Sequence, residues 1–515
     1  MLEVRKEYFA DERDDNLKEI GKGTQRQDML GHVTGASTYF NDHKLQGMLH
    51  LKVLRSEQPH ARLRRIDLTE AERSPGVRRI IRGQDVPRNL NTLLSLINFG
   101  IDDEPTLAVD KVRYLGEPIV AVVADTPREA YEAMSKIRVD YEPLPTVFDA
   151  EEALKPGAPV VNETDPKNTF TYHERYDHQN LRFGDIERGF AEADHIIEHR
   201  YQMSPIEHAT TETNGSIAAP DTNGRYIVYT STQALFFSLD TCAKILDVPS
   251  NTFHFVGGTV GGGFGGKVDT LTEPLSILAA MLTGRPVRYV LGREEEMQFA
   301  SPRGAERIYL KDGVRRDGRI VARKVRAYTD SGAYTRLSSY GVVKCVAHLP
   351  GPYTIPNVHG EVFCVFTNRT PATAMRGFGV TAMDFAIECQ MDRLAEVVGM
   401  DPMEFRILNA YRDGDMKAHR REAKGTALIE CVQVAAEKAK WPIREEFRRM
   451  SSRQGARAPA APREERIVIA PARAPASPEP ARAYEPPRPA PAPPPQPAPA
   501  HGATRFSSVF GARRR

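Results

Sequence analysis

The residues best suited to chemistry form a glycine-rich segment, residues 257–267, which reads Gly-Gly-Thr-Val-Gly-Gly-Gly-Phe-Gly-Gly-Lys. Seven glycines around one aromatic residue leave backbone N–H groups uncovered by side chains. Glycine adopts positive φ without strain and lets a ligand approach the main chain closely. Successive exposed amides also form a concave site for anions. The segment therefore predicts a loop that binds an anion or a flat cofactor.

Three interpretations of this loop are open. Residues 261–267 satisfy the G-x-x-x-x-G-K part of a phosphate-binding loop. However, Val268 follows and has no hydroxyl for Mg²⁺, and no later apolar run ending in Asp supplies a second metal ligand. A nucleotide site is thus disfavoured. The other two interpretations are a purely structural glycine turn and a site for a pterin that carries a metal.

Composition narrows the class of protein. A chain of 515 residues is long enough for two to four domains. Its formal net charge of +2 does not suggest a nucleic-acid or anionic-membrane partner. The five cysteines are scattered and never in C-x-x-C spacing. This pattern favours reduced thiols and predicts no disulfide framework, zinc site or iron–sulfur cluster on this chain.

The N-terminus indicates where the protein works. Residues 1–15 are rich in charge and contain no apolar core of a secretory signal. The longest apolar stretches, such as residues 118–124 and 275–282, are too short to cross a bilayer. We therefore expect a cytoplasmic protein without a membrane partner.

Hydrophobic periodicity predicts a mixed α+β, or α/β, protein. After an N-terminal arm at residues 1–20, residues 21–150 form a strand-rich domain, with buried strands at 48–54 and 119–124 and a helix at 127–137. Residues 151–182 are predicted as a polar linker.

A second domain is predicted over residues 183–445. Its expected strands and helices are strands at 195–202, 225–230 and 252–256 and helices at 185–193, 234–246, 270–282, 401–410 and 425–438. Residues 307–334 are expected to form a long hairpin that turns at Asp317-Gly318. The glycine-rich segment thus lies between a strand and a helix, where cofactors bind in mixed α/β domains.

Two further segments have distinct patterns. A second glycine turn, residues 374–379, opens a helix whose apolar residues share one face and are read as core: Met383, Ile387, Met391, Leu394 and Val398. Residues 453–515 change to Pro, Ala and Arg and cannot bury enough apolar area to fold. This tail is predicted to be disordered.

With these residues in view, the chain resembles, over roughly residues 21–442, the molybdopterin-binding large subunit of the xanthine dehydrogenase and aldehyde oxidase family. In the first domain the resemblance to the family's a/b hammerhead domain rests on the stretches 26–28, 33–35, 48–50, 60–61, 66–67, 75–77 and 116–118. In the second domain, similar to the first cofactor-binding domain, it rests on His208-Ala209 with Glu212, Ser231-Thr-Gln233, 261–267, 353–357 and 376–379.

The resemblance assigns residues to a molybdenum–molybdopterin cofactor. The implied cofactor-binding residues are Gln233, Gly263, Phe264, Gly265, Gly266 and Arg376. Of these, Gln233, Phe264 and Arg376 are implied to surround the molybdenum, with Gln233 as a hydrogen-bond donor at the start of a helix. Alternatively, Gln233 is an ordinary surface amide near a helix cap, and Arg376 a surface cation.

The implied substrate residues are Val268, Lys344 and Phe378. Purine-oxidising members of the family carry Glu where Val268 lies and Arg where Lys344 aligns. Phe378 would contact an aromatic substrate edge-on. Lys344 suits an anionic substituent on an aromatic aldehyde or N-heterocycle, unless it points to solvent.

The resemblance also implies the reaction, a hydroxylation with oxygen from water, and two partners, an iron–sulfur subunit with [2Fe–2S] and a flavin subunit with FAD. The expected catalytic Glu belongs to a second cofactor-binding domain that is absent from this sequence, so the catalytic base is unknown. Either a separate chain carries that domain or the product is truncated. The isolated chain is then expected to be inactive, and a non-catalytic scaffold remains the alternative function.

Overall fold

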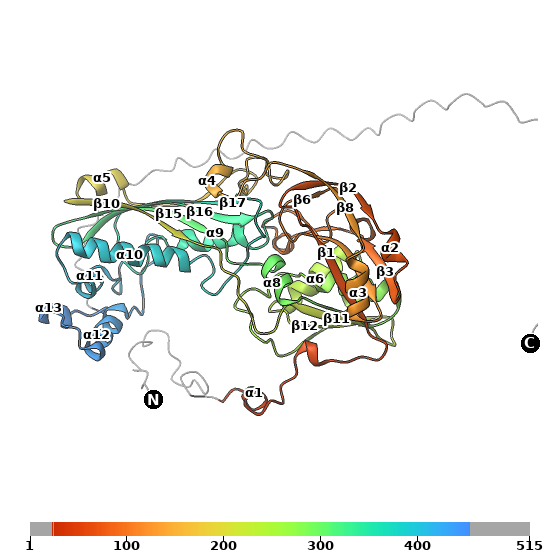
Figure 1. Cartoon of the computed structure of the whole chain (residues 1–515). Coiled ribbons are helices and arrows are strands. Elements are labelled where there is room, and N and C mark those ends of the chain that lie inside the picture. The colour runs from red at the N-terminus through yellow and green to blue at the C-terminus, as the bar shows by residue number, and fades with distance from the viewer. Residues whose placement is uncertain (1–22, 24, 454–515) are drawn as a thin grey trace, which may run out of the picture. The chain divides into compact units, whose positions relative to one another are not determined.

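The computed structural model of the chain describes residue 23 and residues 25–453. The arm predicted at residues 1–20 and nearly all of the tail predicted at 453–515 lie outside the described residues. The described part combines two large β-sheets with helices that pack against both (Figure 1). The predicted mixed α+β class is confirmed.

The larger sheet has seven strands in the order β13-β12-β11-β14-β1-β7-β3. These strands are β1 (Leu49–Arg55), β3 (Val77–Arg82), β7 (Pro118–Ala124), β11 (Gly215–Pro220), β12 (Tyr226–Thr230), β13 (Phe253–Gly257) and β14 (Val287–Val290). β1 pairs in parallel with β14, and Leu49 lies opposite Val287. The sheet therefore joins strands from both sides of the boundary expected near residue 150.

Helices cover this sheet, which explains why its strands are rich in apolar residues. All seven residues of β7 are buried, as expected for the apolar run Pro-Ile-Val-Ala-Val-Val-Ala. α3 (Pro127–Met134) packs on β1 and β7, and the Thr126 hydroxyl caps it by accepting from the Glu129 N–H. α7 (Glu273–Thr283) packs on β11 and β14 and also against α6 (Leu235–Leu246).

The second sheet has five strands in the order β10-β15-β16-β17-β9. They are β9 (Gln179–Phe183), β10 (His195–Met203), β15 (Glu306–Val314), β16 (Ile320–Gly332) and β17 (Val358–Phe366). β15 and β16 form the predicted hairpin, and Gly318 at its turn has φ of +87°. α9 (Ser338–Ala347), α10 (Thr381–Val397) and α11 (Pro402–Asn409) lie below this sheet in Figure 1, whereas α4 (Ala150–Ala153) and α5 (Ile186–Ala191) lie above it.

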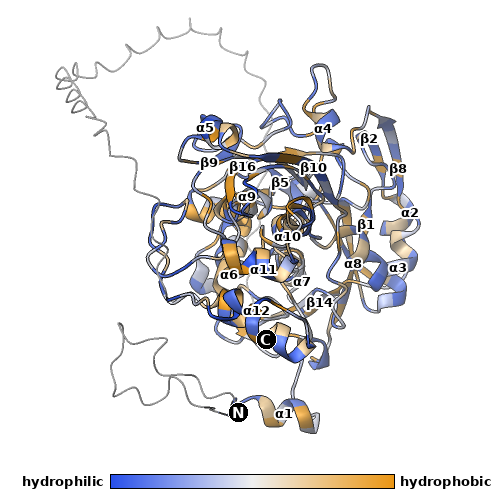
Figure 2. Ribbon diagram, turned by 90° about the vertical axis from the view of Figure 1, so that its left-hand side faces the viewer, coloured by the Kyte–Doolittle hydropathy of each residue, from blue (hydrophilic) through white to orange (hydrophobic). Residues whose placement is uncertain are grey.

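Burial follows the predicted pattern. Met383, Ile387, Met391 and Leu394 of α10 are fully buried, so their assignment to the core is confirmed. Hydrophobic residues dominate α6, whereas hydrophilic residues are prominent in α3 at the periphery (Figure 2).

The remaining elements are short. They are α1 (Met29–Thr34), α2 (Thr69–Glu72), α8 (Arg293–Phe299), α12 (Leu428–Ala439), α13 (Glu445–Arg448), β2 (Ala61–Asp67), β4 (Leu90–Asn91), β5 (Glu104–Pro105), β6 (Lys111–Val112) and β8 (Arg138–Pro143), with 3-10 turns at Phe40–Asp42, Gly83–Asp85, Leu93–Ile97 and Ser250–Thr252. No helix within the described residues is long and apolar enough to cross a membrane.

The segment expected as a polar linker, residues 151–182, contacts the core. Phe170 and Tyr172 are buried, and their rings pack edge to face with centroids 4.8 Å apart. β9 at its end pairs with β17 as the edge of the five-stranded sheet. The domain boundaries near residues 150 and 183 stay a prediction.

Candidate functional site

The glycine loop, residues 257–267, runs from the end of β13 towards α7, as the sequence predicts. Its backbone has positive φ at three turning points, Gly262 (93°), Phe264 (52°) and Gly265 (106°). Phe264 is the informative one because a bulky residue rarely adopts this conformation. Its side chain is also 50% exposed. An exposed aromatic residue held in a strained backbone conformation is typical of a ligand site.

Gln233 binds this loop from the start of α6. Its side-chain Oε1 accepts hydrogen bonds from the N–H groups of Gly265 (2.9 Å) and Lys267 (3.3 Å). Its own backbone N–H donates to the Lys267 carbonyl over 2.8 Å. A side chain on Gly263 would overlap the Gln233 amide. Since Oε1 is engaged with the loop, the Nε2 group is left as a donor for a bound molecule.

The second glycine turn, residues 374–379, contacts the glycine loop directly. The Arg376 N–H donates to the Phe264 carbonyl over 2.7 Å. Any side chain on Gly265 would overlap the Ala374 carbonyl oxygen. His208 Nε2 donates to that same oxygen over 3.0 Å, and burial lowers the pKa of His208. The glycines thus permit two loops 110 residues apart in sequence to touch through their backbones.

Arg376 contributes mainly through its backbone. Arg376 is an exposed residue. Its backbone carbonyl accepts hydrogen bonds from Arg303 Nη2 over 2.7 Å and from Thr381 Oγ1 over 3.2 Å. Arg303 therefore fixes the position of the turn beside Phe264.

Glu306, the first residue of β15, lies buried near Arg303. Its Oε2 makes no hydrogen bond within the described part of the chain. Burial raises the pKa of Glu306 from an ordinary value of 4.5 to about 7, although the Arg303 charge opposes the shift. Because the folded protein holds the proton more tightly than the unfolded chain, this group stabilises the fold at low pH. The stabilisation is lost as pH rises from 4.5 through 7.

We therefore expect Glu306→Gln to be more stable than the wild type at pH 8, by on the order of 2–3 kcal/mol. Well below pH 4.5, for example at pH 3.5, the difference should disappear, because the carboxyl group is then neutral in both the folded and the unfolded wild type. Urea denaturation at the two pH values measures the effect. An equal difference at both pH values would contradict it.

Lys267, the last residue of the glycine loop, points into the protein. Its side chain is 0% exposed, and Nζ forms an ion pair with Glu212 Oε2 over 2.9 Å. The same oxygen accepts from the Gly261 N–H over 2.7 Å. A phosphate-binding loop requires a lysine that reaches the ligand. Lys267 is instead paired with Glu212. Because Val268 also lacks the hydroxyl that would hold Mg²⁺, two requirements of a nucleotide site are not met.

The three expected substrate residues lie close together around the second glycine turn, which contains Phe378. Val268 and Phe378 belong to one apolar cluster with Leu93, Leu94, Phe99, Leu337, Tyr340 and Ala374. Phe378 packs against Gly341 of α9, where any side chain would contact its ring at 2.8 Å. Lys344 is one helical turn further along α9, with Nζ 5.2 Å from the Tyr340 ring centroid.

Tyr340 and the leucines of this cluster were not predicted from the sequence. Leu93 and Leu94 come from a 3-10 turn in the first 150 residues, and Tyr340 comes from α9. No motif marks them, because their role depends on contacts between segments more than 200 residues apart. Only the aromatic character of Tyr340, one helical turn before Lys344, offers a weak signal.

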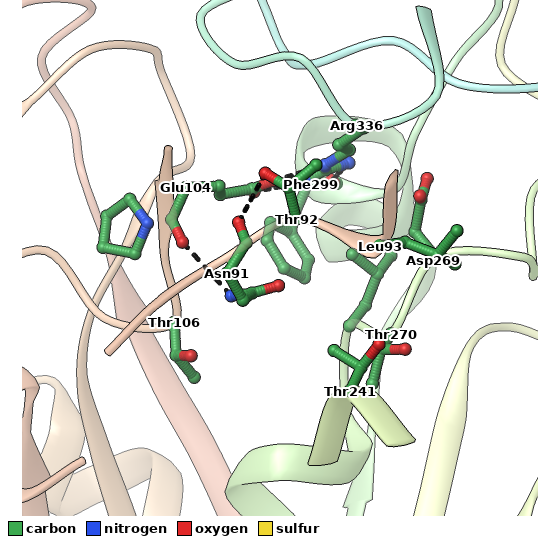
Figure 3. Close-up of a pocket in the computed structure, with 12 residues that line it drawn as sticks. Asn91, Thr92, Leu93, Glu104, Thr106, Thr241, Asp269, Thr270, Phe299 and Arg336 are labelled. Atoms are coloured by element: carbon green, nitrogen blue, oxygen red, sulfur yellow. Dashed lines mark hydrogen bonds and ion pairs between the residues drawn. The ribbon is translucent and has the colours of Figure 1, made fainter. Parts of the chain in front are cut away.

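A separate polar cavity is lined by residues of the first 110 positions together with Thr241, residues 269–271, Phe299 and Arg336 (Figure 3). Thr106, Thr241 and Thr270 surround its lower part, and the Arg336–Glu104 ion pair of 2.8 Å closes its top. The three threonine hydroxyls are buried without a hydrogen-bond partner among the described residues. None of the residues predicted for cofactor or substrate lines this cavity.

Comparison with known proteins places the chain in a family. Residues 34–145 match the aldehyde oxidase and xanthine dehydrogenase a/b hammerhead domain, and residues 163–410 match the molybdopterin cofactor-binding domain. The nicotinate dehydrogenase large molybdopterin subunit of Eubacterium barkeri is 32% identical over 421 residues, which cover 82% of this chain and 96% of that protein. The chain therefore belongs to the molybdopterin-binding large subunits of the xanthine dehydrogenase and aldehyde oxidase family.

Two further relatives differ in length from this chain. The aldehyde oxidoreductase of Megalodesulfovibrio gigas is 30% identical over 441 residues, which cover 81% of this chain but 47% of that protein. The solved structure of quinoline 2-oxidoreductase from Pseudomonas putida 86 superposes with a TM-score of 0.74 at 29% identity, over 82% of this chain and 54% of that one. The chain thus spans about half the length of these two relatives. The predicted family and its molybdopterin cofactor are confirmed.

Proposed function

We propose that the chain is the cofactor-binding subunit of a molybdenum hydroxylase that oxidises an aldehyde or an aromatic N-heterocycle with oxygen from water. The observation that carries the proposal is the junction of the two glycine segments, where Phe264, the Gln233 amide and the Arg376 backbone meet. The glycines allow this junction to form, because side chains at Gly263 and Gly265 would overlap the Gln233 amide and the Ala374 carbonyl oxygen.

Each residue at the junction has a distinct part in the proposal. Gln233 Nε2 donates a hydrogen bond to an oxygen of the bound group, while Oε1 keeps the amide fixed to the loop. Gly263, Gly265 and Gly266 make space for Gln233, Ala374 and His208, which shape the loop that would receive the pterin. Phe264 and Arg376 would lie next to the metal. When bound, the molybdenum centre supplies two-electron redox chemistry and activates water. Val268 and Phe378 provide an apolar surface for an aromatic substrate.

The rest of the cofactor site comes from a separate chain. The chain spans about half of the Megalodesulfovibrio gigas relative but nearly all of the Eubacterium barkeri large molybdopterin subunit. A cofactor-binding part that is divided between two polypeptides agrees with the length of the Eubacterium barkeri subunit. Iron–sulfur and flavin subunits then carry the electrons away, and the complex works in the cytoplasm.

The general base is assigned to that other chain. Glu212 is occupied by Lys267 and the Gly261 N–H, and Glu207 Oε2 accepts from the Ala209 N–H. Each carboxylate is thus engaged through one oxygen, while Glu212 Oε1 is buried without a hydrogen-bond partner among the described residues. Neither glutamate lies in a motif that assigns it the role of the base.

The chain expressed alone with a molybdenum supply is expected to be inactive, because in this proposal a separate chain supplies the rest of the cofactor enclosure and the base. The natively purified complex is expected to oxidise aromatic aldehydes or N-heterocycles. Steady-state assays on both preparations, with the same substrate panel, test the proposal. Robust turnover by the isolated chain would contradict it, and a natively purified complex that binds no pterin would favour the scaffold function.

Substrate ranking provides a further test, since Val268 presents an apolar surface to the substrate. A polar edge of a purine that faces Val268 loses its partner, at a cost of about 1–3 kcal/mol. We expect kcat/KM of the complex for an aromatic aldehyde or a carboxylated N-heterocycle to exceed that for xanthine. The opposite ranking would contradict the assignment of Val268 to the substrate site.

A further inference from the structure

α9 presents Tyr340, Gly341 and Lys344 towards the second glycine turn. A side chain on Gly379 would overlap the Gly341 carbonyl oxygen and contact Lys344 Cβ at 3.0 Å, so helix and turn are in close contact. Residues at positions i and i+4 lie on the same face of a helix, which places Tyr340 and Lys344 side by side. Both therefore lie beside Phe378, on the proposed substrate surface.

The ring of Tyr340 is held in place by two aromatic neighbours. Phe99 packs edge to face against it with a centroid distance of 5.4 Å and an interplanar angle of 89°. Phe378 lies 6.3 Å away with its ring tilted by 35°. The Tyr340 hydroxyl makes no hydrogen bond with any other described residue. The Tyr340 ring is therefore held in place, and its hydroxyl is a hydrogen-bond donor without an acceptor among the described residues.

The ammonium group of Lys344 adds a positive charge next to the Tyr340 ring. Within the part of the chain that the structure describes, its ammonium group has no carboxylate partner and no hydrogen bond. It lies 5.2 Å from the Tyr340 ring centroid, a distance at which a cation is attracted by the aromatic face. Lys344 is an exposed residue, as the solvent-facing alternative expects. The Tyr340 ring supports its ammonium group at the solvent side of the apolar cluster that contains Val268 and Phe378.

We propose that Tyr340 and Lys344 together bind an anionic substituent, with a carboxylate as the best fit, on the aromatic substrate of this enzyme. Tyr340 donates one hydrogen bond through its hydroxyl and Lys344 donates a second, charge-assisted one. The aromatic ring of the ligand then lies against Val268 and Phe378. This inference rests on the proposed function and specifies its substrate class, and it makes Tyr340 a specificity-determining residue.

The test is equilibrium binding of benzoate and of its neutral analogue benzamide to the natively purified complex. Lys344→Met keeps the length of the side chain but removes the charge. We expect it to weaken benzoate binding by about tenfold or more, and Tyr340→Phe to weaken it by about three- to tenfold. Lys344→Met should not change benzamide binding more than about twofold, because benzamide carries no charge.

Lys311→Met serves as the matched control. Lys311 Nζ also lies over an aromatic ring, 5.3 Å from the centroid of Phe190, but it is on β15 at the opposite face of the five-stranded sheet from α9. This variant should bind benzoate like the wild type. Benzoate affinity that does not depend on Lys344 and Tyr340, or the absence of benzoate binding to the wild type, would overturn the inference.

Oxidation of benzaldehyde separates this inference from the proposed function. Benzaldehyde has no anionic substituent, so its turnover depends on the hydroxylase activity and not on the Lys344–Tyr340 pair. Benzaldehyde oxidation by the wild-type complex, together with weakened benzoate binding in Lys344→Met, supports both proposals. Benzaldehyde oxidation with unchanged benzoate binding refutes the inference alone. Selective benzoate binding in a complex that oxidises none of the substrate panel refutes the function and leaves the anion site intact.

Discussion

Replacing Gly265 by valine is expected to reduce the molybdopterin content of the purified complex by at least about tenfold. Gly265 has φ of +106°, and its missing side chain leaves space for the Ala374 carbonyl oxygen. A β-branched side chain would strain the backbone and push the second glycine turn away from Phe264. Pterin released from the denatured protein and quantified by its fluorescence gives the content per chain.

Gly224→Val provides the matched control for this experiment. Gly224, in the turn between β11 and β12, also has positive φ, +77°, but nothing lies within 4 Å of a side chain placed there. Both variants carry backbone strain, whereas only Gly265→Val separates the two loops. A folded Gly265→Val complex with the same pterin content as Gly224→Val would show that the glycine loop does not bind the cofactor.

Lys267→Met is expected to lower the free energy of unfolding by about 3–5 kcal/mol, because it leaves Glu212 as a buried carboxylate without its cation. Both side chains are nearly or fully buried, and desolvation lowers the pKa of Lys267 even though Glu212 opposes the shift. Urea denaturation of the isolated chain at pH 7 measures the loss.

The double variant Lys267→Met with Glu212→Gln is the control. It removes the unpaired charge and should recover most of the stability, since an intact buried ion pair contributes little relative to a neutral replacement. Equal losses in the single and double variants would contradict the role of the ion pair. On the same account, Val268→Ser should not create ATP hydrolysis, because Lys267 remains bound to Glu212.

The local features of this protein were readable from sequence. The Asp317-Gly318 turn, the buried face of α10 and the position of the glycine loop between β13 and α7 all follow from short-range rules of turn chemistry and periodicity. Each of these features depends on residues within about 20 positions of one another, so a single sequence contains the required information.

The features that were not predicted depend on contacts across the chain. The parallel pairing of β1 with β14 joins residues 238 positions apart, and β14 is only four residues long. Residues 151–182 read as polar, yet Phe170 and Tyr172 in that segment are buried. Lys267 has the right spacing for a phosphate ligand, and only the buried Glu212 beside it reverses that interpretation.

The candidate site also combines features that the sequence predicted with contacts that it did not. The glycine loop was singled out from its own composition, whereas Gln233 and Arg376 were assigned by the family resemblance. The structure brings these residues into contact through Phe264 and Ala374. Tyr340 was missed because its significance comes from Phe99 and Phe378, which are distant in sequence. A half-buried tyrosine in a helix has no sequence signature of its own.

The most direct test of the account is metal and pterin analysis of the complex purified under native conditions through this chain. We expect stoichiometric molybdenum and molybdopterin, together with copurifying iron–sulfur and flavin subunits and a further chain that completes the cofactor site. An intact, folded complex that contains neither molybdenum nor pterin would contradict the account and identify the chain as a scaffold.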